Sequence, residues 1–98
     1  MRHVPYLDDL TDVEAAAVGS AVRRAAIAVR AELDPEHVFS AVIGRGIPHF
    51  HQHVFPRHRG MPDETPWHDS AYWPGAPRGG EAEVAALAAR LRRYFTAV

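Results

Sequence analysis

The chain contains no cysteine, no long apolar run and no large excess of charge of either sign. A membrane-spanning helix needs about 20 consecutive apolar residues, and a secretory leader needs a shorter apolar core near its start. Neither pattern follows Met1, so we expect a cytoplasmic protein with no membrane partner. Eleven basic and twelve acidic residues give a formal net charge of −1, whereas nucleic-acid binders usually carry a basic excess. No nucleic-acid partner is expected, and any phosphate site must be local.

The length of 98 residues predicts a single domain, 1–98, whose core covers only about two-thirds of the surface that the unfolded chain exposes. Hydrophobic periodicity predicts the order helix, strand, strand, helix. A sheet of two strands is marginal in water by itself. We therefore predict an α+β fold that is completed by dimerisation with a second copy.

Local signals define the expected elements. The first helix is predicted over 11–33, because Thr11 and Glu14 form a capping box and apolar residues then recur every three or four positions. A second amphipathic helix is expected over 81–96, with acidic residues first and basic residues last. Residues 1–10 are expected to form an extended lead-in.

Two β-rich segments, 37–44 and 47–55, predict an antiparallel hairpin packed against the first helix. Gly44 and Gly46 make the positive φ of a tight loop easy. Arg45 would then lie at one end of the second segment, where it can hold a phosphate or simply face solvent.

The second segment carries the most chemically suggestive pattern, because His49, His51 and His53 occupy alternate positions. Alternate side chains of a strand share one face, with neighbouring rungs about 6.6 Å apart and the outer two about 13 Å apart. Three such rungs do not easily converge on zinc, which needs nitrogen ligands at about 2.0–2.1 Å. A row of imidazoles suits an extended anion instead. A neutral imidazole is also a nucleophile, so the row can attack phosphorus while its neighbours orient it and protonate a leaving group.

A long segment rich in proline, glycine and tryptophan, 58–78, follows the histidines. Loops longer than about 12–15 residues in compact domains are usually functional or disordered. Trp67 and Trp73 favour packing, and two uses stay open for them: stacking on a base, or anchoring the loop on the core.

The stretch His49-Phe50-His51-Gln52-His53-Val54-Phe55 resembles the histidine-triad (HIT) signature, and Pro56-Arg57 extends the match to hydrolase-type members. Gln52 stands where the family usually has a hydrophobic residue. The resemblance covers the later part of the family pattern. The family's opening helix and strands have no counterpart, so we expect either a naturally short variant or a chain that has lost its start.

The resemblance implies nucleotidyl chemistry with His51 as the nucleophile on an α-phosphate, and with His49 and His53 orienting it and handling the leaving-group proton. The candidate substrate-binding residues are Arg45, Gly46, Arg57 and Trp67. The resemblance also implies homodimers, a small nucleotide or nucleoside phosphate as the partner, and no required cofactor.

Two functions follow. The first is a HIT-like nucleotide hydrolase or nucleotidyl transferase that acts on a phosphoanhydride or phosphoramidate through a nucleotidyl-histidine intermediate. The alternative is a non-hydrolytic protein that binds a ligand or a divalent metal through the histidine row, completed by His3, His58 or His68. Gln52 bears on the choice, because its amide should point to the face opposite the histidines and needs partners there.

Overall fold

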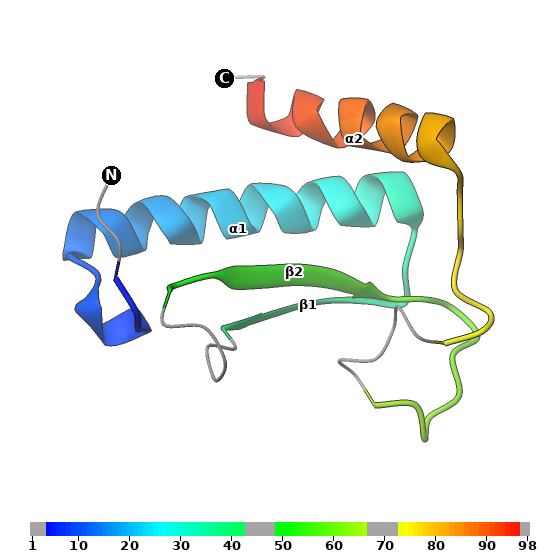
Figure 1. Cartoon of the computed structure of the whole chain (residues 1–98), viewed down its shortest axis with the longest axis horizontal. Coiled ribbons are helices and arrows are strands. Elements are labelled where there is room, and N and C mark those ends of the chain that lie inside the picture. Colours follow the sequence, from blue (N-terminus) through cyan, green and yellow to red (C-terminus); the bar gives the residue numbers. More distant parts are fainter. Residues whose placement is uncertain (1–3, 43–48, 67–72, 97–98) are drawn as a thin grey trace.

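The computed structural model describes residues 4–42, 49–66 and 73–96. A 3₁₀ turn, η1 (Leu7–Asp9), precedes helix α1 (Asp12–Leu33), and strands β1 (His37–Val42) and β2 (Gln52–Arg57) precede helix α2 (Glu81–Thr96). Helix α1 lies between the hairpin and α2, so the elements form three layers (Figure 1). The helix, strand, strand, helix order is as predicted, whereas the expected extended lead-in instead contains η1.

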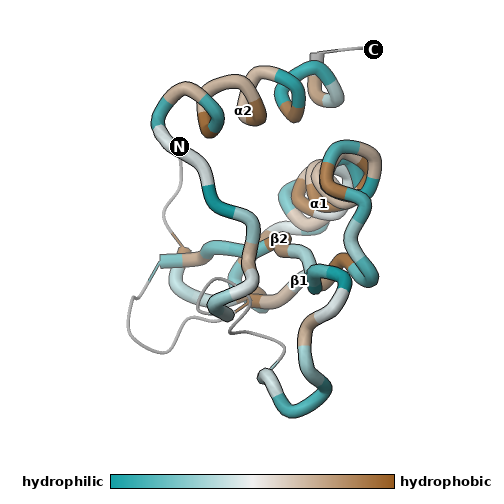
Figure 2. The backbone as a smooth tube through the Cα atoms, turned by 90° about the vertical axis from the view of Figure 1, so that its right-hand side faces the viewer, coloured by the Kyte–Doolittle hydropathy of each residue, from teal (hydrophilic) through white to brown (hydrophobic). Residues whose placement is uncertain are grey.

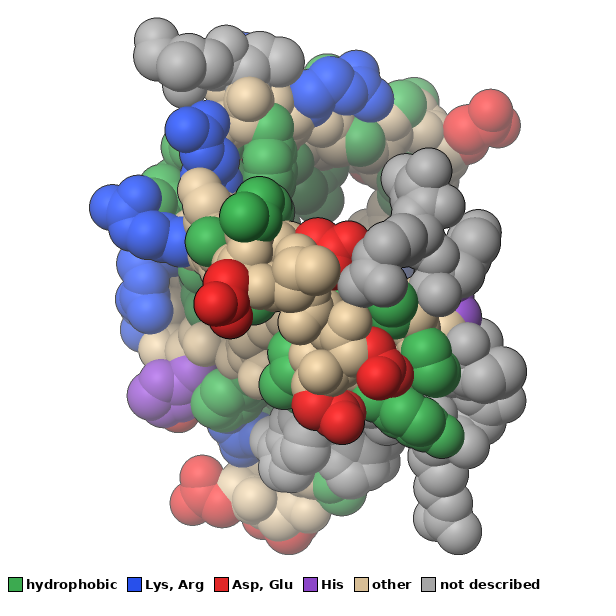
Figure 3. Space-filling model, turned by 90° about the vertical axis from the view of Figure 1, so that its left-hand side faces the viewer, with side chains coloured by type: hydrophobic (Ala, Val, Ile, Leu, Met, Phe, Trp, Pro, Cys, Tyr) green, Lys and Arg blue, Asp and Glu red, His purple; other side chains and the backbone are tan. Residues whose placement is uncertain are grey.

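Helix α1 begins at the predicted capping box. The Glu14 amide donates to Thr11 Oγ1 at 3.1 Å, and the Thr11 amide donates to Glu14 Oε1 at 2.8 Å. Acidic side chains of η1 and of the first turn of α1 gather at this end of the molecule (Figure 3), where they complement the helix dipole. At the other end Asp34 adopts a left-handed conformation with φ of 45°, and Arg59 Nε donates to its carbonyl at 3.0 Å. A side chain thus forms a hydrogen bond at each end of α1.

The hairpin is antiparallel, as predicted, and pairs Val42 with Gln52 at one end and His37 with Arg57 at the other. The prediction of a second strand over 47–55 was wrong in its bounds, because residues 49–51 precede β2 and Pro56-Arg57 belong to it. The Phe50 amide donates to the carbonyl of Val4 at 2.6 Å, so this part of the main chain is bonded to the N-terminal segment rather than to β1. Beyond Pro56, which lacks a donor, the Arg57 carbonyl still accepts from the Glu36 amide at 2.9 Å. The predicted tight loop over 44–46 lies outside the described residues.

Few side chains in the described part of the chain are fully covered. The buried hydrophobic residues are Ala28 and Met61, and Pro35 is also fully buried. Hydrophobic positions of α2 face α1 (Figure 2), yet Val84 and Phe95 stay 59% and 42% exposed. The described fold therefore has a thin core, and its completion by dimerisation stays a prediction.

Candidate active site

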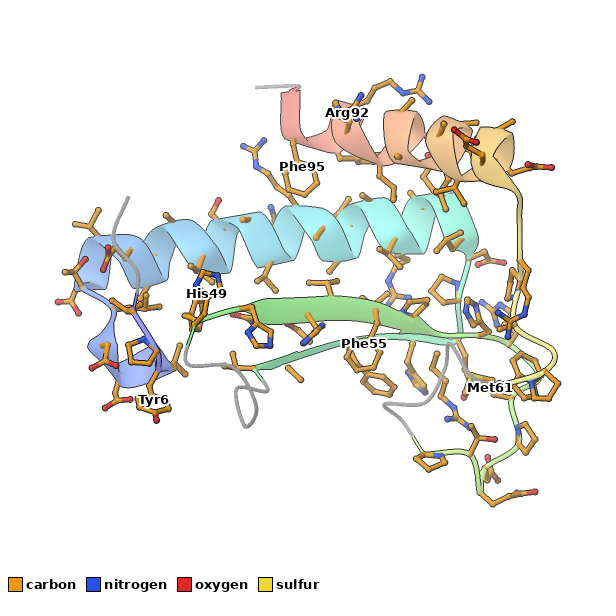
Figure 4. The ribbon with its side chains drawn as sticks, in the orientation of Figure 1. Tyr6, His49, Phe55, Met61, Arg92 and Phe95 are labelled. Carbon is orange, nitrogen blue, oxygen red and sulfur yellow. The ribbon has the colours of Figure 1, made fainter. Side chains whose placement is uncertain are left out.

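The histidine stretch lies at the start of β2, beneath the first half of α1. His49 lies between that start and α1 (Figure 4). The bond from the Phe50 amide to the Val4 carbonyl ties the stretch to the N-terminal segment. A connection that is distant in sequence, and not only the hairpin, thus fixes the path of these residues.

The His51 ring has a defined orientation. Its Nδ1 lies 2.8 Å from the carbonyl oxygen of His49. A carbonyl oxygen can only accept a hydrogen bond, so Nδ1 must carry the proton. In the neutral imidazole this leaves the lone pair on Nε2, so Nε2 is the ring nitrogen that can act as a nucleophile.

His51 and His53 are neighbours, but they are not parallel rungs of a strand. Their ring centroids are 5.1 Å apart and their planes meet at 87°, an edge-to-face contact. His51 precedes β2 and only His53 belongs to it, so the two rings do not stand on successive rungs of one strand. The His51 and His53 rings thus form a close edge-to-face pair, and the main-chain oxygen of His49 contacts the His51 ring. The catalytic roles of all three histidines stay a prediction.

The Gln52 amide, whose burial argued against a normal triad, has a partner. Gln52 lines a groove on the α1 side of the hairpin together with His51, whereas the expectation was that it would face away from the histidines. Its Nε2 donates to Ser40 Oγ at 2.9 Å. Ser40 Oγ in turn donates to the main-chain oxygen of His53 at 2.9 Å. The sequence analysis did not identify Ser40 as a site residue. Ser40 could have been recognised from its polarity, because it interrupts an apolar stretch of β1 and the polar Gln52 lies on the partner strand.

Two open, mainly apolar grooves flank the histidine stretch on the side of α1. One of about 370 Å³ includes His49 and Glu14 in its lining, and one of about 400 Å³ includes His51 and Gln52. Val18 and Phe50 line both. Phe95 points from α2 toward α1 (Figure 4) and contributes to the larger groove. His49 and His51 thus each border a hollow that combines apolar walls with a few polar groups, as small-molecule sites do.

Of the four candidate substrate-binding residues, the described part of the chain includes Arg57 alone. Arg57 is 9% exposed, and its guanidinium donates to the carbonyls of Thr65, Met61 and Pro62 at 3.4, 3.3 and 2.8 Å. These bonds favour a structural role, holding the segment after β2, over contact with a phosphate. Arg45, Gly46 and Trp67 lie outside the described residues.

Trp73 lies close to two glycines of the long segment after β2. A Cβ atom placed on Gly75 would lie 2.5 Å from Cζ2 of Trp73, so the indole packs directly on that glycine. A Cβ on Gly60 would lie 3.9 Å from the same ring. The ring therefore lies between two parts of the long segment after β2. Its anchoring on the core, and stacking on a base, stay predictions.

The described residues contain no group of three or more His, Asp or Glu side chains that could hold a metal ion. His58, a suggested extra ligand, is half-buried, and burial lowers its pKa. His3 and His68 lie outside the described residues. Among the helices described, neither is long and apolar enough to cross a membrane.

Comparisons with known proteins identify the fold. No protein-family model and no curated sequence matches the chain. Solved structures that resemble it include two with a TM-score of 0.73: a histidine triad (HIT) protein from Sinorhizobium meliloti 1021 at 20% identity, and a histidine triad protein from Bradyrhizobium japonicum at 22%. Each similarity covers 93% of this chain and 66% of the other. The chain therefore has the HIT fold, as its histidine signature implies, and spans just under two thirds of the length of these neighbours.

Proposed function

We propose that this protein is a HIT-type nucleotide hydrolase or nucleotidyl transferase that acts on a phosphoanhydride or phosphoramidate. The observation that carries the proposal is the 2.8 Å contact between His51 Nδ1 and the His49 carbonyl. This contact keeps the proton on Nδ1 and leaves Nε2 as a nucleophile, which is the requirement for covalent catalysis at phosphorus.

In the proposed reaction the Nε2 lone pair of His51 attacks the α-phosphorus of the substrate. A P–Nε2 bond forms, the P–O or P–N bond to the leaving group breaks, and the leaving group takes a proton. Water or an acceptor alcohol then attacks the same phosphorus, the P–Nε2 bond breaks, and its electron pair returns to Nε2. His53, whose ring centroid lies 5.1 Å from that of His51, is the proposed proton carrier, because imidazole gains and loses protons near neutral pH.

Turnover by the purified protein tests this proposal. We expect release of nucleoside monophosphate from at least one of a set of nucleoside phosphoramidates and diadenosine polyphosphates. His51→Ala should reduce kcat by about 10³-fold or more, since a covalent nucleophile has no substitute. His37→Ala, at the far end of β1, is the matched control and should retain activity. Equal turnover by the wild type and His51→Ala would remove His51 from the mechanism.

We also propose that the protein works as a homodimer, because only two strands pair in the described sheet and Val84 and Phe95 remain exposed on α2. Light scattering at micromolar concentration should give twice the chain mass of 10.8 kDa. A stable monomer under these conditions would contradict this part of the proposal.

A further inference from the structure

One hydroxyl group of β1 holds both the side chain and the main chain at the start of β2. Ser40 Oγ receives the Gln52 amide at 2.9 Å and contacts the His53 carbonyl oxygen at 2.9 Å. Because the carbonyl only accepts, the Ser40 proton points at His53, and the lone pair of Ser40 faces the amide N–H of Gln52. The donors therefore run in one direction, from Gln52 through Ser40 to His53, and each bond polarises the next.

The two bonds of Ser40 lie at the end of the paired part of the hairpin. Gln52 is the first residue of β2, and the described main-chain pairing between the strands ends where it faces Val42. The ends of paired strands open more readily than their middles. His51 lies just outside the paired part of the hairpin and His53 just inside it. The side-chain bonds therefore hold the main chain at the point where the pairing between β1 and β2 ends.

We infer that Ser40 and Gln52 are positioning residues for the histidine pair, an inference that rests on the proposed function. They fix the main chain between His51 and His53. By doing so they keep the two rings 5.1 Å apart and keep His51 Nδ1 within 2.8 Å of the His49 carbonyl. Neither residue touches the reacting atoms. The polar residue at position 52 thus has a role that a hydrophobic residue there could not fill.

Two substitutions of Gln52 distinguish the effect of its N–H donor from the effect of its side-chain shape. Gln52→Met keeps the length of the side chain and removes the donor. Gln52→Glu keeps the shape, but its carboxylate only accepts and so competes with the His53 carbonyl for the proton of Ser40. Gln52→Glu should therefore disturb the site more than Gln52→Met.

Ser40 provides a second, independent pair of variants. Ser40→Ala removes the hydroxyl, whereas Ser40→Thr keeps it on a residue that suits a strand. His37→Gln changes an exposed residue at the far end of β1 and is the control for a substitution in β1 away from the histidines of β2. Circular dichroism of every variant establishes that it is folded before it is compared.

The first readout is the tautomer of His51 in the ligand-free protein, measured from the ¹⁵N shifts of its imidazole. Wild type, Ser40→Thr and His37→Gln should show the proton on Nδ1. Ser40→Ala and Gln52→Glu should lose this preference, and the Nε2–H form should appear. The second readout is turnover, in which Ser40→Ala should lower kcat by about 10-fold to 100-fold and leave KM within about twofold, as expected for misplaced reacting groups. Gln52→Glu should also raise KM for an anionic nucleotide, because it adds a carboxylate to the groove that Gln52 shares with His51.

The two proposals fail in different ways. If folded Ser40→Ala, Gln52→Met and Gln52→Glu all keep the wild-type tautomer of His51, the positioning role is overturned, whatever the activity of the wild type. If Gln52→Glu behaves like Gln52→Met, the one-directional chain of donors is wrong. If Ser40→Ala does not fold, the two Gln52 variants decide. If the wild type turns over none of the substrates, the proposed function fails, and the tautomer comparison still decides whether Ser40 and Gln52 position His51.

Discussion

Tyr94 of α2 donates its hydroxyl to Oε2 of Glu32 in α1 at 2.8 Å, and Arg90 donates Nε to Oε1 of the same carboxylate at 2.9 Å. The bond from Tyr94, followed by the contact with Arg90, lowers the pKa of Glu32 below its ordinary value of 4.5. The same bond raises the pKa of Tyr94 above 10.0. The attachment of α2 to α1 is therefore sensitive to pH at both extremes.

The first prediction concerns this pH dependence. A lowered carboxyl pKa adds stability above pH 4.5 that is lost as the pH falls through the pKa of the folded state. A raised tyrosine pKa adds stability below pH 10.0 that is lost as the pH rises through the pKa of the folded state. Tyr94→Phe should lower the unfolding temperature between these limits and flatten its dependence on pH at both ends.

Thermal melts from pH 3 to pH 11, followed by circular dichroism, measure the effect. Tyr6→Phe makes the same chemical change at an exposed tyrosine before α1 and should leave the pH profile unchanged. Identical profiles for wild type and Tyr94→Phe would show that the bond to Glu32 does not hold α2 in place.

The second prediction concerns the buried guanidinium of Arg57. A lysine ammonium at this position cannot reach three carbonyls that are arranged around a planar group. Arg57→Lys should therefore lower the free energy of unfolding by about 1.5–3 kcal/mol, the range for hydrogen bonds to charged groups. Arg59→Lys, at an exposed arginine two residues along, should cost less than about 0.5 kcal/mol. Urea denaturation compares the two, and equal losses would contradict the structural role of Arg57.

The third prediction uses two glycines in opposite environments. A Cβ on Gly75 would meet the Trp73 ring at 2.5 Å, so Gly75→Ala should displace the indole and destabilise the protein by about 1–3 kcal/mol. Gly19 lies inside α1, and a Cβ there would meet nothing within 4 Å. Gly19→Ala should therefore stabilise the protein by about 0.5–1 kcal/mol.

Tryptophan fluorescence in a Trp67→Phe background reports on Trp73 alone. Its emission should shift with Gly75→Ala and stay constant with Gly19→Ala. An unchanged spectrum and unchanged stability in Gly75→Ala would mean that Trp73 does not pack on that glycine.

Local sequence patterns were sufficient to predict the helices and the strand pairing. The capping box of Thr11 and Glu14 marks the start of α1, and helix α2 occupies the predicted range 81–96. Both depend on residues a few positions apart, whose interactions follow from helix geometry alone. The antiparallel pairing of the two β-rich segments was predictable because only a short glycine-containing stretch joins them.

Interactions between distant segments were not predictable from local patterns. Strand β2 begins at Gln52, shortly after Phe50, which forms a main-chain bond with Val4 between segments that are far apart in the chain. The burial of Arg57 likewise depends on carbonyls of a loop whose path no periodicity reveals. The sequence placed His49, His51 and His53 in one stretch, but the edge-to-face contact of the last two depends on side-chain rotamers that no sequence pattern reveals.

The most direct test of the central claim is to locate a covalent intermediate on His51. The protein is mixed with a nucleoside phosphoramidate or diadenosine polyphosphate that it turns over, quenched rapidly at alkaline pH to preserve P–N bonds, and mapped by mass spectrometry. We predict one nucleotidyl group on His51, absent from His51→Ala and present in His37→Ala. Turnover by the wild type without this adduct, or with the adduct on another residue, would contradict the assignment of His51 Nε2 as the nucleophile.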